Sequence, residues 1–281
     1  MSQEQKDRHD DEYKSLEALF IVLLRCLHTD EEESALAALA ELRTDIAFQY
    51  VCRGMGVEVD EAMMLIKNQA DSNLTQYDKD LRDRLIAAIN NLIDFSVCQE
   101  YQLYDEVLDS LNDADIDFDS EEYQGLLGLC EKYNDKYSSI ENSDIEYAGK
   151  IAALWITISS GDYLTYWTQN DANVRPWHMA LQGYTAHKND FPSWMIPPIE
   201  YNCRCFLECT PVSYAQIEAP HIKGSIKALE KPSQISNVYS ESLAKCGRIF
   251  NSSHSYFTVK EKDKEMLMRI VDNIKEKYYG Q

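Results

Sequence analysis

Hydrophobic residues recur every three to four positions through the first half of the chain, which is the spacing of one face of an α-helix. Residues 12–29 carry such a stripe and predict a helix. A second stripe predicts a helix that begins after Thr29 and ends before Gly54 and Gly56, and Thr29 and Glu32 have the spacing of an N-terminal capping box. The two stripes consist of Leu16, Leu19, Phe20, Leu23, Leu24 and Leu27, and of Leu36, Leu39, Leu42 and Ile46.

The same periodicity predicts three more helical segments before residue 160. These are a short helix near 60–69, one long helix or two over 80–111, and a helix over 144–159. The long segment carries Leu81, Leu85, Ile89, Leu92 and Ile93 on one face. Four cysteines, Cys26, Cys52, Cys98 and Cys130, also fall on apolar stripes. We therefore expect these thiols to be small buried hydrophobic side chains.

The pattern changes at Gly161, after which aromatic residues and prolines replace helical periodicity up to about residue 212. Alternation in residues 204–210, RCFLECT, predicts a short strand. A terminal helix is predicted over 261–279. The expected fold is mainly α with a small α+β unit, namely an N-terminal helical region followed by a compact, loop-rich unit with short strands. We expect the apolar face of helix 144–159, which includes Ile151, Leu154, Trp155 and Ile158, to pack on that unit.

Negative charge is concentrated in the first half of the chain. The whole sequence has a net charge of −21, and residues 1–150 hold 35 acidic and 13 basic residues, a difference of −22. The simplest role of such charge is solubility. It also argues against direct DNA binding by the N-terminal half, because the phosphate backbone is itself densely negative.

The N-terminal residues are polar and acidic and do not resemble an export signal, and the longest apolar run, residues 18–24, is too short to cross a membrane. A reducing cytoplasm is therefore the expected compartment. In that compartment the eight cysteines are expected as free thiols or metal ligands rather than disulfides.

An acidic stretch at 113–124 places Asp113, Asp115 and Asp117 at the spacing of a calcium-binding loop. The pattern then fails, because Phe118 stands where the loop needs glycine and Gln124 where it needs a bidentate glutamate. We interpret the stretch as a solvated linker between helices.

Three residues in the loop-rich segment have the chemistry of a zinc site. Cys203 and Cys205 can share a metal if the backbone turns between them, and His178 supplies a nitrogen ligand. Cys209 is a candidate fourth ligand, and His187 or Asp190 can take its place. In the alternative interpretation His178 bonds locally and the thiols pack or stay free. Two arginines nearby, Arg175 and Arg204, are able to bind an anion, although ion pairing with Asp171 or Asp190 is the commoner role.

No motif for a phosphate-binding loop, a dinucleotide site, a nucleophile elbow or a zinc protease occurs in the sequence. We therefore predict that the protein is not an enzyme.

Residues 166–208 closely resemble the core motif of the phage Mu F-like minor head proteins, also called phage head morphogenesis proteins. The motif runs from an aromatic residue and a threonine through Asp-x-x-Val-Arg-x-x-His, Leu-x-Gly, an acidic residue before an aromatic one, Pro-Pro and Asn-Cys-Arg-Cys. The matching residues are Trp167, Thr168, Asp171, Val174, Arg175, His178, Leu181, Gly183, Asp190, Phe191, Pro197, Pro198, Asn202, Cys203, Arg204 and Cys205. Glu200 and Tyr201 depart from the pattern, which usually has glycine and an apolar or aromatic residue there, and Cys209 lies outside it.

The resemblance implies a minor structural protein of a tailed phage or prophage head. Such a protein associates with the portal and head shell and serves head morphogenesis and DNA packaging or ejection. It would reside in the virion head, and in the host cytoplasm during assembly, without binding a membrane. The expected domains are an acidic helical domain at 1–140, the Mu F-like motif domain at 141–212 and a C-terminal extension with a terminal helix at 213–281.

Two alternatives follow from the same resemblance. Mu F-like modules are also fused to toxins or nucleases, in which case activity would lie in the tail, with His221, Arg248, His254 and Lys260 as candidate residues. The other alternative is a host-encoded binding module left by a decayed prophage.

Overall fold

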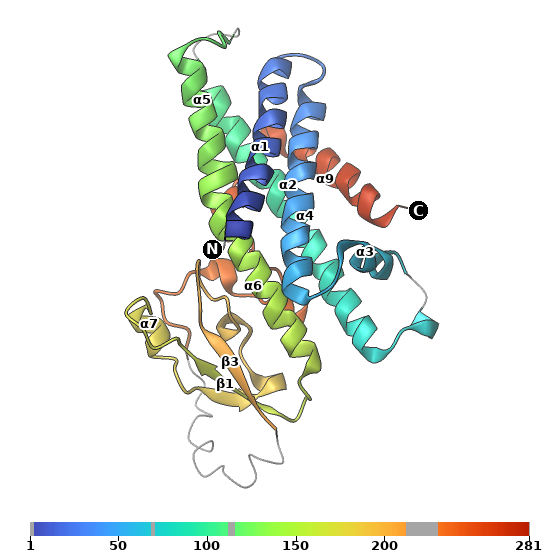
Figure 1. Ribbon diagram of the computed structural model, residues 1–281, viewed down its shortest axis with the longest axis vertical. Helices are drawn as coiled ribbons and strands as arrows, with labels where there is room; N and C mark the ends of the chain where they lie inside the picture. Colours follow the sequence, from blue (N-terminus) through green and yellow to red (C-terminus); the bar gives the residue numbers. More distant parts are fainter. Residues whose placement is uncertain (1–2, 69–70, 112–115, 212–229, 281) are drawn as a thin grey trace. The chain divides into compact units, whose positions relative to one another are not determined.

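A computed structural model describes residues 3–68, 71–111, 116–211 and 230–280 (Figure 1). The protein is mainly α-helical with one small antiparallel sheet, so the predicted fold class is confirmed. Contacts divide the chain into two compact units. The helical unit comprises residues 1–50, 89–143 and 254–281, and the sheet unit comprises residues 51–88 and 144–253. The three domains predicted from the sequence are consecutive segments, whereas each of these units combines separate segments. The three-domain division stays a prediction.

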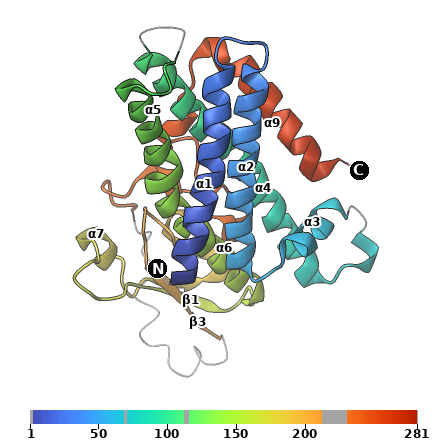
Figure 2. The same ribbon diagram turned by 45° about the horizontal axis from the view of Figure 1, so that its top comes forward.

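The helical unit is built from long amphipathic helices (Figures 1 and 2). Its elements are α1 (Gln3–Cys26), most of α2 (Glu32–Met55), the second part of α4 (Gln76–Ser110), α5 (Glu121–Glu131), a π-helical turn (Lys132–Tyr137), the start of α6 (Ser138–Thr157) and α9 (Lys264–Tyr279). Thr29 and Glu32 both accept from backbone amides just before or at the start of α2, as predicted, but each bonds an amide one residue away from its capping-box partner. Thr29 Oγ1 accepts from the Glu31 amide at 3.2 Å, and the Glu32 carboxylate accepts from the His28 amide at 2.6 Å.

A charged network lies inside the helical unit, at positions that the apolar stripes did not reveal. The Arg43 side chain is fully buried and donates to Gln99 at 2.7 Å and to Asn142 at 2.8 Å. Glu141 lies 3.4 Å from the same guanidinium. Burial raises the pKa of the nearby Glu100 carboxyl to about 7. The bundle therefore keeps a hydrogen-bonded polar core, as a buried charge requires.

Several helix boundaries differ from the predictions. Helix α1 begins nine residues before position 12, α6 begins at Ser138 rather than 144, and the 80–111 segment is one helix. Cys52 and Cys130 are buried as expected, and burial raises the pKa of the Cys52 thiol to about 12. Cys26 and Cys98 are only partly buried, which corrects the prediction for these two thiols.

Helix α2 also continues through Gly54, where the sequence had predicted it to end earlier, and stops at Met55. In the sheet unit, Gly54 meets α6 so closely that a Cβ atom would overlap the carbonyl oxygen of Glu146. A Cβ on Gly149 would lie 2.7 Å from the Val51 carbonyl oxygen. Glycine therefore serves close helix packing here. The helix ends one residue later, where Gly56 takes a φ of 71°.

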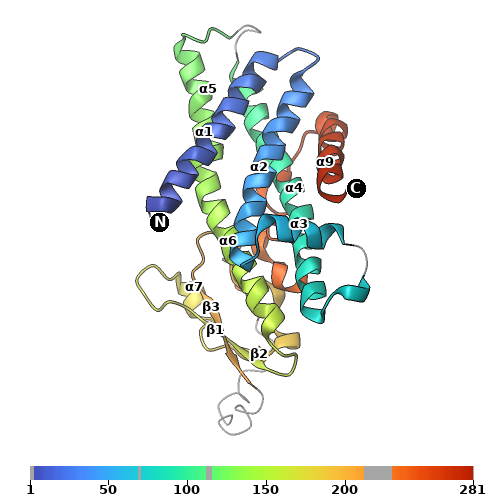
Figure 3. The ribbon, with the colours of Figure 1, turned by 45° about the vertical axis from the view of Figure 1, so that its right-hand side comes forward.

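The sheet of the sheet unit has the strand order β2-β1-β3, with all neighbours antiparallel (Figure 3). Its strands are β1 (Tyr163–Trp167), β2 (Thr185–His187) and β3 (Phe206–Thr210). The prediction of a strand in 204–210 is confirmed by β3, whereas β1 and β2 were not predicted. Helix α3 (Val59–Lys67) and the first part of α4 also belong to this unit.

The C-terminal half of α6 packs on this sheet, as predicted. Ile151, Trp155 and Ile158 share one buried cluster with Leu164 and Leu207 from the strands. Leu154 was expected on the same face but is 38% exposed, which corrects that position. Among the described residues, no helix is both long and apolar enough to cross a membrane.

Candidate metal centre

The structure brings His178, Cys203 and Cys205 together in the sheet unit. Their ligand atoms all lie within 4.8 Å of one another, and the three side chains are at most 4% exposed. His178 Nδ1 is 3.4 Å from the Cys205 sulfur. The predicted clustering is confirmed, while metal binding stays a prediction.

The local backbone conformation positions each ligand residue in the cluster. His178 lies on the single turn α7 (Pro176–Met179), which begins with proline at its first position, where a missing amide proton costs nothing. Cys203 and Cys205 stand at the entrance to β3. Both are buried whereas Arg204 and Phe206 are exposed, because alternate residues of an extended chain face the same side. The two thiols therefore need no backbone turn between them to meet, contrary to the prediction.

A buried carboxylate holds the turn that precedes Cys203. Asn202 has a φ of 56°, a left-handed conformation that asparagine tolerates better than most residues. Its amide donates to both oxygens of Asp144, at 3.0 and 3.1 Å. Tyr239 donates its hydroxyl to the same carboxylate at 2.8 Å. Asp144 thus fixes the backbone next to a ligand.

Glu200 orients the ring of His178. Its Oε2 lies 2.8 Å from His178 Nε2 and also accepts from Trp177 Nε1 at 3.0 Å. Arg175 Nε is 3.3 Å from the same oxygen. With Nε2 engaged, Nδ1 faces the two cysteines. A carboxylate on the far nitrogen of a histidine ligand is a common support of protein zinc sites, because it fixes the tautomer and raises ligand basicity.

The environment distinguishes the two thiols. Hydrogen bonding between them raises the pKa of Cys203 and lowers that of Cys205, and burial raises the pKa of Cys203 further. The positive charges of Arg175 and Arg204 also favour the Cys205 thiolate. Cys205 is therefore the thiol that ionises first, and a cation placed among the three ligand atoms would favour ionisation of both.

The donor set fits zinc. Tetrahedral zinc with Zn–N and Zn–S bonds of about 2.0–2.3 Å holds its ligand atoms about 3.3–3.8 Å apart. The spacing between His178 Nδ1 and the Cys205 sulfur falls in that range. Two sulfur atoms and one imidazole nitrogen suit zinc, whereas magnesium and calcium prefer oxygen ligands.

The remaining motif residues lie around the cluster in different roles. Arg204 pairs with Asp171 at 2.8 Å, as expected for this arginine, and lowers the pKa of that carboxyl. Arg175 pairs with Glu200 instead of an aspartate and donates to the Tyr201 carbonyl at 2.9 Å. Gly183 has a φ of 80°, which only glycine adopts readily.

Pro198 is buried and follows a cis peptide bond from Pro197. Asp190 is exposed at the end of a 3-10 helix, Lys188–Asp190. Neither proline nor aspartate contributes a ligand atom to the three-residue cluster found among the described residues.

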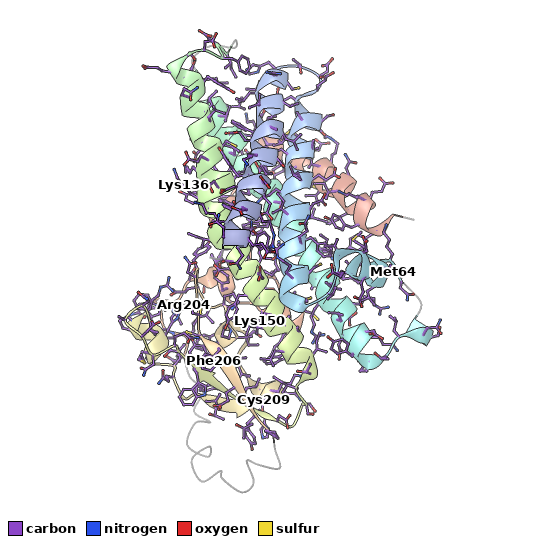
Figure 4. All side chains as sticks on the ribbon, viewed as in Figure 1. Met64, Lys136, Lys150, Arg204, Phe206 and Cys209 are labelled. Atoms are coloured by element: carbon purple, nitrogen blue, oxygen red, sulfur yellow. The ribbon has the colours of Figure 1, made fainter. Side chains whose placement is uncertain are left out.

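The three candidates for a fourth ligand all stand outside that cluster. His187 Nδ1 lies 3.1 Å from the Gly161 carbonyl oxygen. The Cys209 thiol faces Asp162, at 3.9 Å, and Figure 4 shows Cys209 at the far end of β3 from Arg204. These residues therefore do not complete a four-ligand site.

Glu200 and Asp144 are the supporting residues that the sequence did not identify. Glu200 appeared there only as a departure from the expected motif. Asp144 is 58 positions before the turn that it holds. No local pattern marks either role, since each depends on packing between distant segments.

Of the tail residues considered for a nuclease, the structure describes three. His254 is buried, and its Nδ1 accepts from the Tyr256 amide at 3.2 Å, capping a short 3-10 helix. Lys260 pairs with Asp105 at 2.6 Å, and the Arg248 amide donates to Glu241 at 3.1 Å. These contacts stabilise the fold. His221 lies outside the described residues.

The acidic stretch considered for calcium lies partly outside the described residues, since Asp113 and Asp115 belong to the segment 112–115. Asp117 is described and its side chain accepts from the Asp119 amide at 3.0 Å, a local turn contact.

Comparison of the chain with protein-family models, with curated proteins and with solved structures found no match.

Proposed function

We propose that the protein is a minor head protein of a tailed phage or prophage whose sheet unit is braced by a zinc ion on His178, Cys203 and Cys205. The observation that carries the zinc site is the meeting of these three buried ligands beside Glu200, which points His178 Nδ1 toward the sulfurs. The ordered resemblance of residues 166–208 to the Mu F-like motif supports the phage assignment.

The role of the ion is structural. The segment between the end of β1 and Cys205 holds only short helical turns and one three-residue strand, so few regular backbone hydrogen bonds stabilise it. A metal that ties α7 to the start of β3 would replace them, because its binding free energy adds directly to folding. Bound zinc supplies cross-linking of the chain and no redox chemistry.

The partner that we propose is the portal with the adjoining head shell. The charge of −22 on residues 1–150 supports binding to a basic protein surface and disfavours binding to DNA by that half. Attraction of this kind speeds association and weakens as salt rises. The protein then acts by binding in the virion head, and in the host cytoplasm during assembly, rather than by catalysis.

Two measurements test this function. The first is the metal content of protein purified without added metal from zinc-supplemented cells, where we expect about one zinc ion per chain. The second is co-purification with the portal protein encoded by the same phage or prophage, at low and high salt, beside a gel shift on duplex DNA. Association with the portal that weakens with salt, without a DNA shift by residues 1–150, is the expected result. Tight DNA binding with no portal association would contradict the assignment.

A further inference from the structure

A small polar cavity adjoins the candidate metal centre. It has a volume of about 20 Å³ and is bordered by all three ligand residues. The rest of its lining comes from Gln169, Asn173, Val174, Arg175, Asn202 and Arg204. A volume of this size holds a single water, or the donor atom of a slightly longer ligand whose other atoms extend past the exposed Arg204 edge.

The cluster leaves a coordination position for such a ligand. Zinc takes four ligands, and among the described residues the cluster supplies three. Of the three fourth-ligand candidates from the sequence, Cys209 and His187 contact Asp162 and Gly161, and Asp190 is exposed outside the cluster. Three protein ligands with one position left over is the arrangement of an open zinc site rather than a closed one.

The lining selects the charge of the ligand. Arg175 and Arg204 border the cavity, no carboxylate is part of its lining, and the other polar side chains are amides, which can donate hydrogen bonds. The carboxylates that pair with the two arginines lie outside the lining: Glu200 sits behind the imidazole on Nε2, and Asp171 pairs with Arg204 at 2.8 Å. The Arg204 side chain is 50% exposed, so this edge of the cavity lies at the protein surface.

We propose that the zinc ion has its fourth position open to this cavity, where it holds water that a small monodentate anion, such as azide, thiocyanate or a halide, displaces. This inference rests on the proposed zinc site. The exchange replaces one neutral oxygen donor by one anionic donor, and the displaced water leaves to solvent. Arg204 attracts the incoming anion from the rim without binding the metal.

The test uses the full chain with cobalt in place of zinc, because cobalt reports its ligands in visible absorption. We expect azide to shift the bands of the cobalt-loaded protein in a saturable way. Arg204→Gln should weaken azide binding by about 2- to 5-fold, the effect of one partly exposed charge. Arg269→Gln is the matched control, since Arg269 also pairs with a carboxylate at 2.7 Å and is 53% exposed, but belongs to the helical unit. This control should leave azide affinity unchanged.

X-ray absorption on the zinc form gives an independent reading. An open site shows two sulfur and two nitrogen or oxygen neighbours, and Cys209→Ser leaves this shell unchanged. Cobalt bands that do not shift with azide would overturn the open position while leaving the metal site intact. The same holds for a third sulfur neighbour that Cys209→Ser removes. Failure to bind either cobalt or zinc would instead overturn the proposed zinc site, and this inference with it.

Discussion

The Oε2 atom of Glu200 lies 2.8 Å from Nε2 of His178, on the side of the ring away from the two cysteines. This contact fixes which nitrogen faces Cys203 and Cys205. Glu200, which departs from the expected motif, thus supports a ligand. A carboxylate on Nε2 makes Nδ1 a better donor to a metal.

Replacing that carboxylate should weaken metal binding without removing a ligand. For Glu200→Gln we expect zinc affinity to fall by about 10-fold, within the range seen for outer contacts of metal ligands. Glu208→Gln is the matched control, since Glu208 accepts from Trp167 at 2.7 Å on exposed positions of the sheet. Competition with a chromophoric chelator measures both affinities. Equal affinity of the two variants would show that Glu200 does not support the site.

Removing a ligand residue should abolish zinc binding and lower the free energy of unfolding. Cys203→Ser should lose the zinc ion, and with it the stabilisation that binding provides, about 3–4 kcal/mol at free zinc 100 to 1,000 times above the dissociation constant. Thermal unfolding with and without a chelator measures this. Cys209→Ser, outside the cluster, should keep its zinc and its chelator response. A chelator effect that survives in Cys203→Ser would contradict the assignment.

Close packing of α2 on α6 predicts a sharp difference between two glycines. A methyl group on Gly54 would overlap the Glu146 carbonyl, so Gly54→Ala should destabilise the protein by about 1–3 kcal/mol. Gly128, in the middle of α5, has open space at its Cβ position. Gly128→Ala should instead be neutral or stabilise by up to about 1 kcal/mol, because alanine favours helix. Urea unfolding compares the two, and equal effects would refute the close approach.

Buried His254 predicts a loss of stability in mild acid. Burial lowers its pKa to about 4, from an ordinary value of 6.5 in the unfolded chain. The unfolded state therefore binds the proton more readily, and the contribution of His254 to stability falls as pH drops from about 6.5 to 4, by roughly 3 kcal/mol in all.

His254→Asn keeps an acceptor for the Tyr256 amide and removes the titration. Relative to the wild type, its free energy of unfolding should therefore rise by roughly 3 kcal/mol as pH falls from 7 to 4. His28→Asn is the control, since His28 is exposed at a φ of 61°, which asparagine tolerates. A wild-type pH slope in His254→Asn would contradict the prediction.

Glu100 has the opposite effect on the pH dependence of stability. Desolvation raises its pKa to about 7, so the folded state holds the proton more tightly than the unfolded state. Between about pH 4.5 and 7 this carboxyl therefore costs stability as pH rises, by up to about 3 kcal/mol. Glu100→Gln should stabilise at pH 8 and have little effect at pH 4, whereas Glu131→Gln, at an exposed ion pair with Lys136, should stay nearly neutral at both. Calorimetry at the two pH values measures the difference.

Local sequence patterns predicted the helical class and most helix positions. Leucine stripes such as Leu16 to Leu27 predict helices because burial of one face repeats every turn, and the Thr29–Glu32 pair marks a helix start through contacts within one turn. The alternation before and within β3 likewise predicted its strand. The sequence also named the three residues of the metal cluster, since cysteine pairs and histidine are distinctive in an otherwise ordinary composition.

The neighbours of those elements depend on contacts between segments that are distant in the chain. Gly54 looked like a helix end because glycine is a poor helix former, but packing against Glu146 outweighs that preference. Arg43 is buried because Gln99 and Asn142 come to it from distant helices. Glu200 and Asp144 support the metal ligands from distant segments of the sheet unit. Cys209 lies outside the metal cluster because its position on β3 turns its thiol toward Asp162. Local patterns record which face a residue presents, whereas its partner is fixed only when segments far apart in the chain meet.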